Sequence, residues 1–92
     1  MEKSEELRRK LKIEKSAPTY VGLSTVWKLP DGTVHREFGP AITMGDGGVT
    51  YMQNGVMHRE DGPAIISATG LEIYYLNGTP LSKKEFKNRV KP

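Results

Sequence analysis

Two histidines and the charged residues beside them are the side chains of this 92-residue sequence that are best suited to bind a metal ion or a charged ligand. His35 and His58 stand 23 positions apart, and an acidic residue, Glu37 or Glu60, follows each of them two positions later. Imidazole and carboxylate groups can ligate a metal ion, but a structural site needs three or four strong ligands. Two histidines without a third strong ligand are a weak metal signal. We therefore expect no metal and no cofactor, and we interpret both histidines as parts of a hydrogen-bond ladder.

An arginine lies between each histidine and its acidic neighbour. Arg36 and Arg59 have two interpretations. A guanidinium group offers a fork of donors that fits a carboxylate or phosphate on a partner. Alternatively, each arginine braces the sheet by pairing across strands with the acid of the other unit, because neighbours along a strand point to opposite faces. The sequence leaves both open.

The sequence contains no residue pattern typical of an enzyme. There is no G-x-S-x-G, no H-E-x-x-H and no Walker-type loop. It has no cysteine, which excludes disulfides and thiolate metal sites and fits a reducing compartment. The glycine-rich run at 45–48 is not followed by a helix that would hold a phosphate, so we expect a hairpin loop there. These features predict a protein without catalytic residues.

The elements that position these residues repeat with a fixed period. Residues 31–53 and 54–76 align without a gap and are identical at 10 of 23 positions. Asp31-Gly32, Asn54-Gly55 and Asn77-Gly78 fall at the same place in successive units, and Asn or Asp followed by Gly favours a tight hairpin turn. A period of this length indicates stacked units that cannot bury their own faces alone.

Short β-rich runs alternate with these turns. They predict a mainly β fold of stacked antiparallel hairpins, and the glycine-proline pairs at 39–40 and 62–63 predict bends or bulges, since proline cannot donate to the ladder. Trp27 falls one place out of register with Tyr51, and Pro30 marks the extra residue. The expected strands are Tyr20–Leu29, Thr33–Glu37, Ala41–Met44, Val49–Gln53, Val56–Glu60, Ala64–Ala68 and Leu71–Leu76.

A short helix is expected at each end of the repeat. Residues 4–15 read as an amphipathic helix within an N-terminal segment, 1–19, that ends in a linker; the repeat domain is then 20–80. At the other end, residues 81–92 form a capping helix and tail. Ser82 and Glu85 make an S-x-x-E capping box there, and Phe86 and Val90 can fold back over the last hairpin.

Charge and size limit the partners. The net charge of +3 is carried by the ends, because residues 1–16 sum to +2, residues 17–82 to −3 and residues 83–92 to +4. This distribution predicts weak, salt-sensitive nucleic-acid binding at most. No apolar run reaches the roughly 18 residues of a spanning helix, so we expect no membrane contact and a cytoplasmic protein. Open sheet edges and the narrow apolar stripe of the N-terminal helix favour a homodimer.

An aromatic strip completes the candidate surface. Trp27, Tyr51 and Tyr74 precede the hairpin turns, and aromatic and arginine residues are enriched in interface hot spots. The same rings are also the large groups available to fill a small core, and both roles stay open. The expected partner-binding residues are Trp27, His35, Arg36, Tyr51, His58, Arg59 and Tyr74.

The repeat resembles a divergent MORN repeat over residues 20–86. The block His58-Arg59-Glu60-Asp61-Gly62-Pro63-Ala64, nearly duplicated at 35–41, resembles a variant of bacteriophage and bacterial proteins. The resemblance implies an elongated sheet of stacked hairpins that scaffolds protein contacts. It brings no catalytic residues, and the arginine after each histidine departs from the glycine of the common pattern, so a lipid-binding role is not carried over.

The resemblance also gives the functional expectation. We expect a phage protein of this size without catalytic residues to dock on a host protein or complex, such as a defence complex, and to inhibit it. It would then work in the host cytoplasm. The alternative is a protein that binds nucleotides or nucleic acid through the repeated arginines or the basic ends.

Overall fold

The computed structural model describes residues 14–90, and in that range the fold is mainly β, as expected from the repeat. Seven strands form one antiparallel sheet in the order β1-β2-β3-β4-β7-β8-β9, and β5 pairs with β6 in a second, two-stranded ladder. The elements are β1 (Ala17–Val21), β2 (Ser24–Lys28), β3 (Ile42–Thr43), β4 (Val49–Thr50), β5 (Met52–Gln53), β6 (Val56–Met57), β7 (Ile65–Ile66), β8 (Glu72–Leu76), β9 (Thr79–Leu81) and α2 (Lys83–Arg89).

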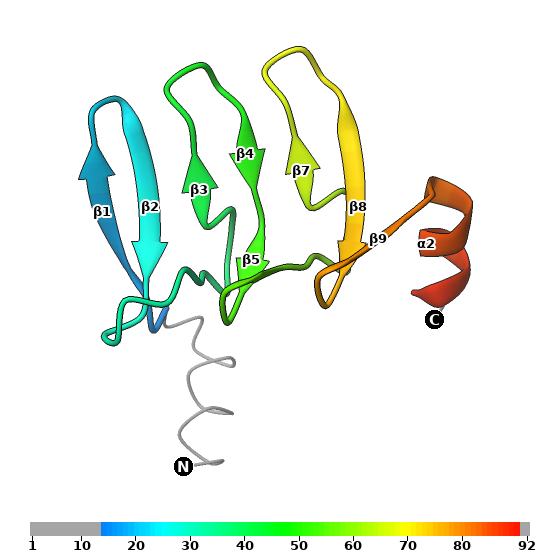
Figure 1. Cartoon of the computed structure of the whole chain (residues 1–92), viewed down its shortest axis with the longest axis horizontal. Helices are drawn as coiled ribbons and strands as arrows, with labels where there is room; N and C mark the ends of the chain where they lie inside the picture. The colour runs from blue at the N-terminus through cyan, green and yellow to red at the C-terminus, as the bar shows by residue number, and fades with distance from the viewer. Residues whose placement is uncertain (1–13, 91–92) are drawn as a thin grey trace.

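Three hairpins stand side by side in this sheet (Figure 1). Their turns form two rows, one at each end of the strands, and we call these rows the upper and the lower edge. At the upper edge, the Met44 N–H donates to the Gly48 carbonyl between β3 and β4, and the Ser67 N–H donates to the Leu71 carbonyl between β7 and β8. Each of these closing pairs encloses a three-residue loop. Gly47 and Gly70 occupy their third positions with φ of 98° and 92°, which explains why the repeat keeps both glycines. Such loops combine a turn with a final residue in the left-handed region.

The Asn-Gly turns lie at the lower edge, and the structure confirms two of them. Asn54 and Gly55 have φ of 50° and 84°, and Asn77 and Gly78 have 49° and 82°, as a type I′ turn requires. Asp31-Gly32 differs, because only Gly32 has positive φ. Pro30 lengthens this loop to three residues, and the Leu29 N–H donates to the Thr33 carbonyl across it at 2.8 Å. The extra residue explains why Trp27 is one place out of register.

Several predicted strands have different bounds in the structure. The run predicted as one strand, Tyr20–Leu29, is a hairpin that turns at Gly22, so that Val21 pairs with Ser24. β1 begins at Ala17, within the segment expected to be a linker. The expected strand Thr33–Glu37 is reduced to one bridge between Lys28 and Val34, and the chain bends at 37–39. The helix predicted over 4–15 falls almost entirely outside the described residues.

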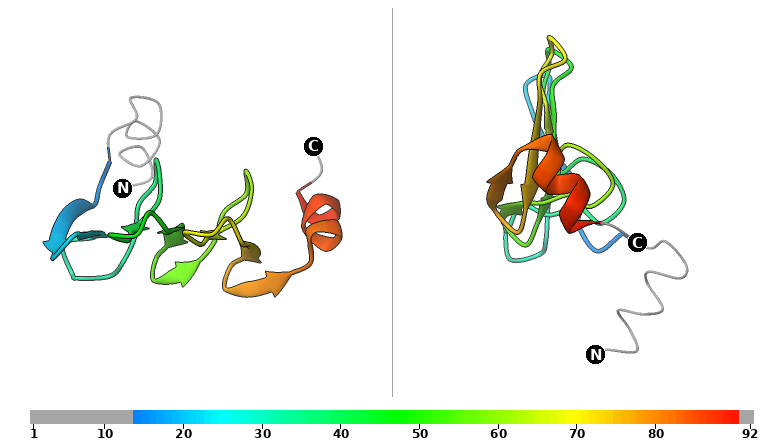
Figure 2. Two further views of the ribbon diagram at one scale, coloured as in Figure 1. Left: turned by 90° about the horizontal axis from the view of Figure 1, so that it is seen from above. Right: turned by 90° about the vertical axis from the view of Figure 1, so that its right-hand side faces the viewer.

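The sheet is a single thin layer (Figure 2, left), so little hydrophobic core is possible. Among the described residues, only Ala41, Ala64 and Phe86 are buried hydrophobic residues. The two alanines are equivalent positions of the repeat, and the N–H of the aromatic residue preceding each hairpin, Trp27 or Tyr51, donates to their carbonyls at 2.7 and 2.6 Å. Backbone ladders and contacts between adjacent units must therefore supply most of the stability.

The C-terminal helix caps the array as the sequence predicts. Ser82 is the N-cap, its hydroxyl accepts from the Glu85 N–H at 3.1 Å, and the Glu85 carboxylate accepts from the Ser82 N–H at 2.9 Å. Hydrogen bonding from Ser82 lowers the pKa of Glu85. Phe86 is 4% exposed, and its ring lies 4.8 Å from the ring of Tyr74, the last member of the aromatic strip. The helix thus covers the end of the sheet.

Removing the Phe86 ring should open this cap. We expect Phe86→Ala to lower the free energy of unfolding by about 3 kcal/mol, as is typical of a buried aromatic residue. Leu71→Ala, at an exposed loop residue, should change it by less than about 0.5 kcal/mol. Urea denaturation of both variants measures the difference, and equal stability of the two proteins would contradict the capping role.

Candidate functional site

Each histidine joins two consecutive units. The Nδ1 atom of His35 accepts from the Asn54 backbone N–H at 2.9 Å, and the Nδ1 atom of His58 accepts from the Asn77 N–H at the same distance. An accepting Nδ1 places the proton of the neutral ring on Nε2. The imidazole thus fixes the Asn-Gly turn of the following unit, which supports the ladder interpretation of the sequence.

Each arginine guanidinium lies over an aromatic ring. The Cζ atom of Arg36 is 3.8 Å from the centroid of Trp27, and that of Arg59 is 3.9 Å from the centroid of Tyr51. A guanidinium at this distance from an aromatic face forms a cation–π contact. The Nη1 atoms also donate to backbone carbonyls, at 3.3 Å to Pro40 and 3.1 Å to Pro63.

The glycine three positions after each arginine packs against the other side of the guanidinium. A Cβ at Gly39 would lie 2.9 Å from Cζ of Arg36, and one at Gly62 would lie 3.5 Å from Cζ of Arg59. The repeated Arg-x-x-Gly-Pro sequence therefore describes one structural unit, in which the arginine fills the space between a ring and a glycine. The cross-strand pairing of each arginine with the other unit's acid is not among the contacts of the described residues.

Glu14 closes the first of these loops. Its carboxylate accepts from the Glu37 N–H at 2.9 and 3.0 Å and from the Phe38 N–H at 2.9 Å. The hydroxyl of Ser16 donates to the same carboxylate at 2.8 Å, and Nε of Arg36 lies 4.0 Å away. We call the two consecutive N–H groups of Glu37 and Phe38 the first cradle. Adjacent backbone N–H groups of this kind form concave anion sites.

Burial and hydrogen bonding act on Glu14 in opposite directions. Partial burial raises the pKa of its carboxyl, but the hydrogen bonds from Glu37, Phe38 and Ser16 together outweigh it, and the pKa is lowered below its ordinary value of 4.5. The folded state therefore favours the charged carboxylate. Sequence reasoning missed this residue, because Glu14 precedes the recognisable repeat and was assigned to a helix.

Glu14, His35 and Glu37 bring ligand-type atoms within 4.8 Å of one another. This trio is the strongest metal candidate among residues 14–90, but its chemistry does not favour a cation. The Glu14 oxygens already accept from four donor groups, and Nε of Arg36 adds a positive charge beside them. Nδ1 of His35 already accepts from the Asn54 N–H, and among the described residues Nε2 of His35 and Oε1 of Glu37 are buried without a hydrogen-bond partner. We interpret the trio as a polar cluster within the fold.

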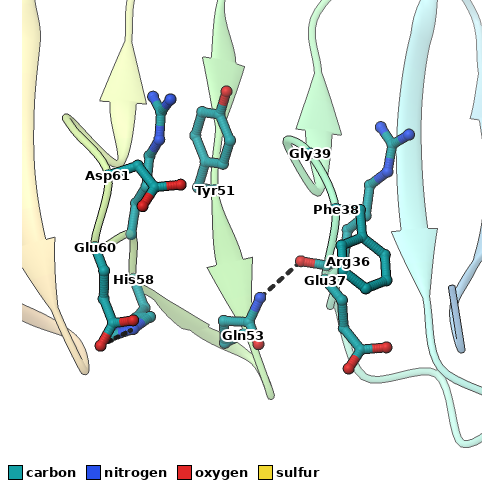
Figure 3. A pocket seen from close by; sticks show the side chains of 10 residues that line it. Arg36, Glu37, Phe38, Gly39, Tyr51, Gln53, His58, Glu60 and Asp61 are labelled. Carbon is teal, nitrogen blue, oxygen red and sulfur yellow. Dashed lines mark hydrogen bonds and ion pairs between the residues drawn. The ribbon is translucent and has the colours of Figure 1, made fainter. Parts of the chain in front are cut away.

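A groove lies between the two repeated loops and opens to solvent. Its volume is about 730 Å³, and Figure 3 shows Arg36, Glu37 and Phe38 on one wall, His58, Glu60 and Asp61 on the other, and Tyr51 and Gln53 between them. The side chain of Gln53 donates to the Arg36 carbonyl at 2.7 Å. A smaller cavity of about 550 Å³ follows between the second loop and α2.

The expected partner-binding residues divide between these features. The groove brings together Arg36, Tyr51, His58 and Arg59, whereas Trp27 lies under Arg36, His35 is 2% exposed, and Tyr74 packs against Phe86. Sequence reasoning missed Phe38, Gln53 and Asp61, because it selected candidate residues from the positions at which the two units are identical, and the units differ at these three. Variable positions within a repeat are the signal that points to them.

The two glycines offer a matched test of the arginine pocket. We expect Gly39→Ala to lower the free energy of unfolding by about 2 kcal/mol, because Gly39 has a φ of 143° and its added Cβ meets Arg36. Gly62→Ala meets Arg59 at an ordinary contact distance and should cost less than about 1 kcal/mol. Thermal denaturation of both variants decides the point, and a larger loss at Gly62 would refute the packing described here.

The Glu14 contact should make stability depend on pH. Because folding lowers this pKa, the carboxylate stabilises the fold above pH 4.5, and that contribution is lost as the pH falls through the folded pKa. We expect Glu14→Gln to cost about 1–2 kcal/mol at pH 7 and progressively less below pH 4.5. Asp31 and Glu85 also have lowered pKa values, but they are common to both proteins and cancel in the difference. A difference independent of pH in urea titrations would count against the contact.

Comparison of the chain with protein-family models, curated proteins and solved structures found no match. Within the part of the chain that the structure describes, no helix has the length and apolar character needed to cross a membrane. The case for a function therefore depends on the groove and the loops that form it.

Proposed function

We propose that the chain is a non-enzymatic protein-binding module that receives a segment of its partner in the groove between the two repeated loops. The observation that supports this most directly is the groove itself, which two copies of one structural unit hold open side by side. Small rigid repeats commonly use the surface between adjacent units for binding.

The groove contains the kinds of groups found at protein interfaces. Phe38 is 39% exposed on its wall, Tyr51 lies between the walls, and the arginine guanidinium groups are held by rings instead of moving freely. Ordering these long side chains before binding reduces the entropy lost in the complex. The proposed docking residues are therefore the exposed parts of Arg36, Phe38, Tyr51, Gln53, Arg59 and Asp61.

The nucleic-acid alternative has less support. The faces of both guanidinium groups lie on rings, and Glu37, Glu60 and Asp61 place three acidic residues around the groove. Negative charge at these positions opposes a phosphate backbone. If the chain is encoded by a phage, as the repeat resemblance suggests, the proposed partner is a host protein or complex that docking inhibits in the cytoplasm.

Two exposed hydrophobic residues provide a matched test. We expect Phe38→Ser to weaken partner binding by at least about tenfold, a loss of roughly 1.4 kcal/mol, with an unchanged melting temperature. Leu71→Ser removes a similarly apolar group from the β7–β8 loop, away from the groove, and should leave binding intact. Affinity capture from host lysate with quantitative mass spectrometry compares the three proteins. Loss of the partner with the Leu71 variant and its retention with the Phe38 variant would reject the groove.

A further inference from the structure

The second repeated loop contains the same pair of backbone donors as the first, and the two loops follow the same course. Both bend over three residues after the arginine, at 37–39 and 60–62. In both loops the backbone N–H of the arginine donates to a backbone carbonyl of the neighbouring strand. Arg36 donates to Met52 at 3.2 Å, and Arg59 donates to Tyr75 at 3.3 Å. The N–H groups of Glu60 and Asp61 are thus the counterparts of those of Glu37 and Phe38, and we call them the second cradle.

The two cradles differ in occupancy. Glu14 fills the first with its carboxylate, whereas among residues 14–90 no group accepts a hydrogen bond from the Glu60 or Asp61 N–H. Glu14 lies 23 residues before Glu37 and so belongs to the preceding unit, and the equivalent approach to the second cradle is from the side of the first loop, where the groove lies. Glu60 and Asp61 line the groove, and they also line the smaller cavity on the α2 side of their loop.

The repeat itself supplies a candidate ligand that does not reach the site. Glu37 stands 23 residues after Glu14 and therefore occupies the equivalent position before the second cradle. Its carboxylate instead belongs to the cluster with His35 and Glu14, and Figure 3 shows it directed away from the opposite wall, which carries Glu60 and Asp61. The second cradle consequently remains available to a carboxylate from elsewhere.

We propose that the second cradle binds a carboxylate from an acidic side chain of the partner protein. This inference rests on the proposed function and names the chemical group that the groove recognises. The first cradle is the precedent within the same molecule, since it holds a glutamate with three N–H···O contacts of 2.9–3.0 Å. Charge-assisted hydrogen bonds of this kind are among the stronger polar contacts, and successive backbone N–H groups form concave sites that bind anions.

The residues around the second cradle adjust its affinity. Arg59 is on the same loop and supplies positive charge, as Arg36 does beside Glu14. Asp61 stands where the first loop has Phe38, and its negative charge, with that of Glu37 and Glu60 in the same groove, opposes an incoming carboxylate. The site therefore binds an isolated carboxylate weakly and needs the rest of a docked segment for higher affinity.

Amide chemical shifts of the full-length protein test the site directly. The probes are acetate and the peptide of residues 12–19 of this chain, which contains Glu14, with a Glu14→Gln peptide as the matched control. We expect acetate and the glutamate peptide to shift the Glu60 and Asp61 amide resonances in a saturable way at pH 7, while the glutamine peptide and sodium chloride of equal ionic strength do not. Shifts confined to Glu37 and Phe38, or no saturable shifts, would overturn the proposal.

Two protein variants sharpen the result. Asp61→Asn keeps the shape of the side chain but removes the charge, and it should tighten peptide binding about threefold, as expected for one exposed charge contact. Weaker or unchanged binding by this variant would speak against the site. The Glu14→Ala protein leaves the first cradle without a side-chain acceptor, so the peptide should then shift the amides of both cradles, which confirms that the measurement detects an occupied cradle.

The carboxylate site and the proposed function can fail separately. If the second-cradle amides do not respond but Phe38→Ser still abolishes capture of the partner, protein docking stands and the carboxylate assignment is wrong. If the amides respond to acetate and the glutamate peptide while Phe38→Ser leaves capture of the partner unchanged, the carboxylate site stands and groove docking is wrong.

Discussion

The hydrogen bond from each Asn-Gly turn to the histidine of the preceding unit is the contact on which the array depends. A sheet one layer thick has almost no interior, so its units cannot be held together by a shared hydrophobic core. The imidazole of His35 or His58 fixes the turn that starts the next hairpin, and the glycine of that turn donates to the residue preceding the histidine, at 2.8 Å in both cases. The spacing of successive units follows from these paired bonds.

The spacing of the units also places each repeated arginine over an aromatic ring. With the hairpins held in register, each guanidinium covers the ring that precedes it in the array, and the glycine-proline bend closes over its other side. At the end of the array Ser82 stands where a third repeat arginine would be, 23 residues after Arg59, and Phe86 of α2 covers Tyr74 instead. Residues that resemble a binding surface in the sequence thus have a second role, because they replace the missing core.

The sequence predicts the fold well where the turn chemistry is local. Asn54-Gly55, Asn77-Gly78 and the Ser82 capping box form as expected, since a few adjacent residues determine each of them. The β1–β2 turn at Gly22 escaped prediction, because its flanking residues form one uninterrupted β-rich run. The first cradle was also beyond the sequence, because it consists of backbone N–H groups that hold Glu14, and a side-chain pattern does not report such donors.

Because each unit contacts only the units next to it, the number of binding grooves depends on the number of units. Each loop of the His-Arg-Glu type forms a groove only together with the loop of the next unit, so the number of such grooves is one fewer than the number of such loops. The two loops of this chain form a single groove of this kind among the described residues. Insertion of one further 23-residue unit would add a second groove of the same kind without altering either cap, so duplication of a short segment would convert a monovalent module into a bivalent one.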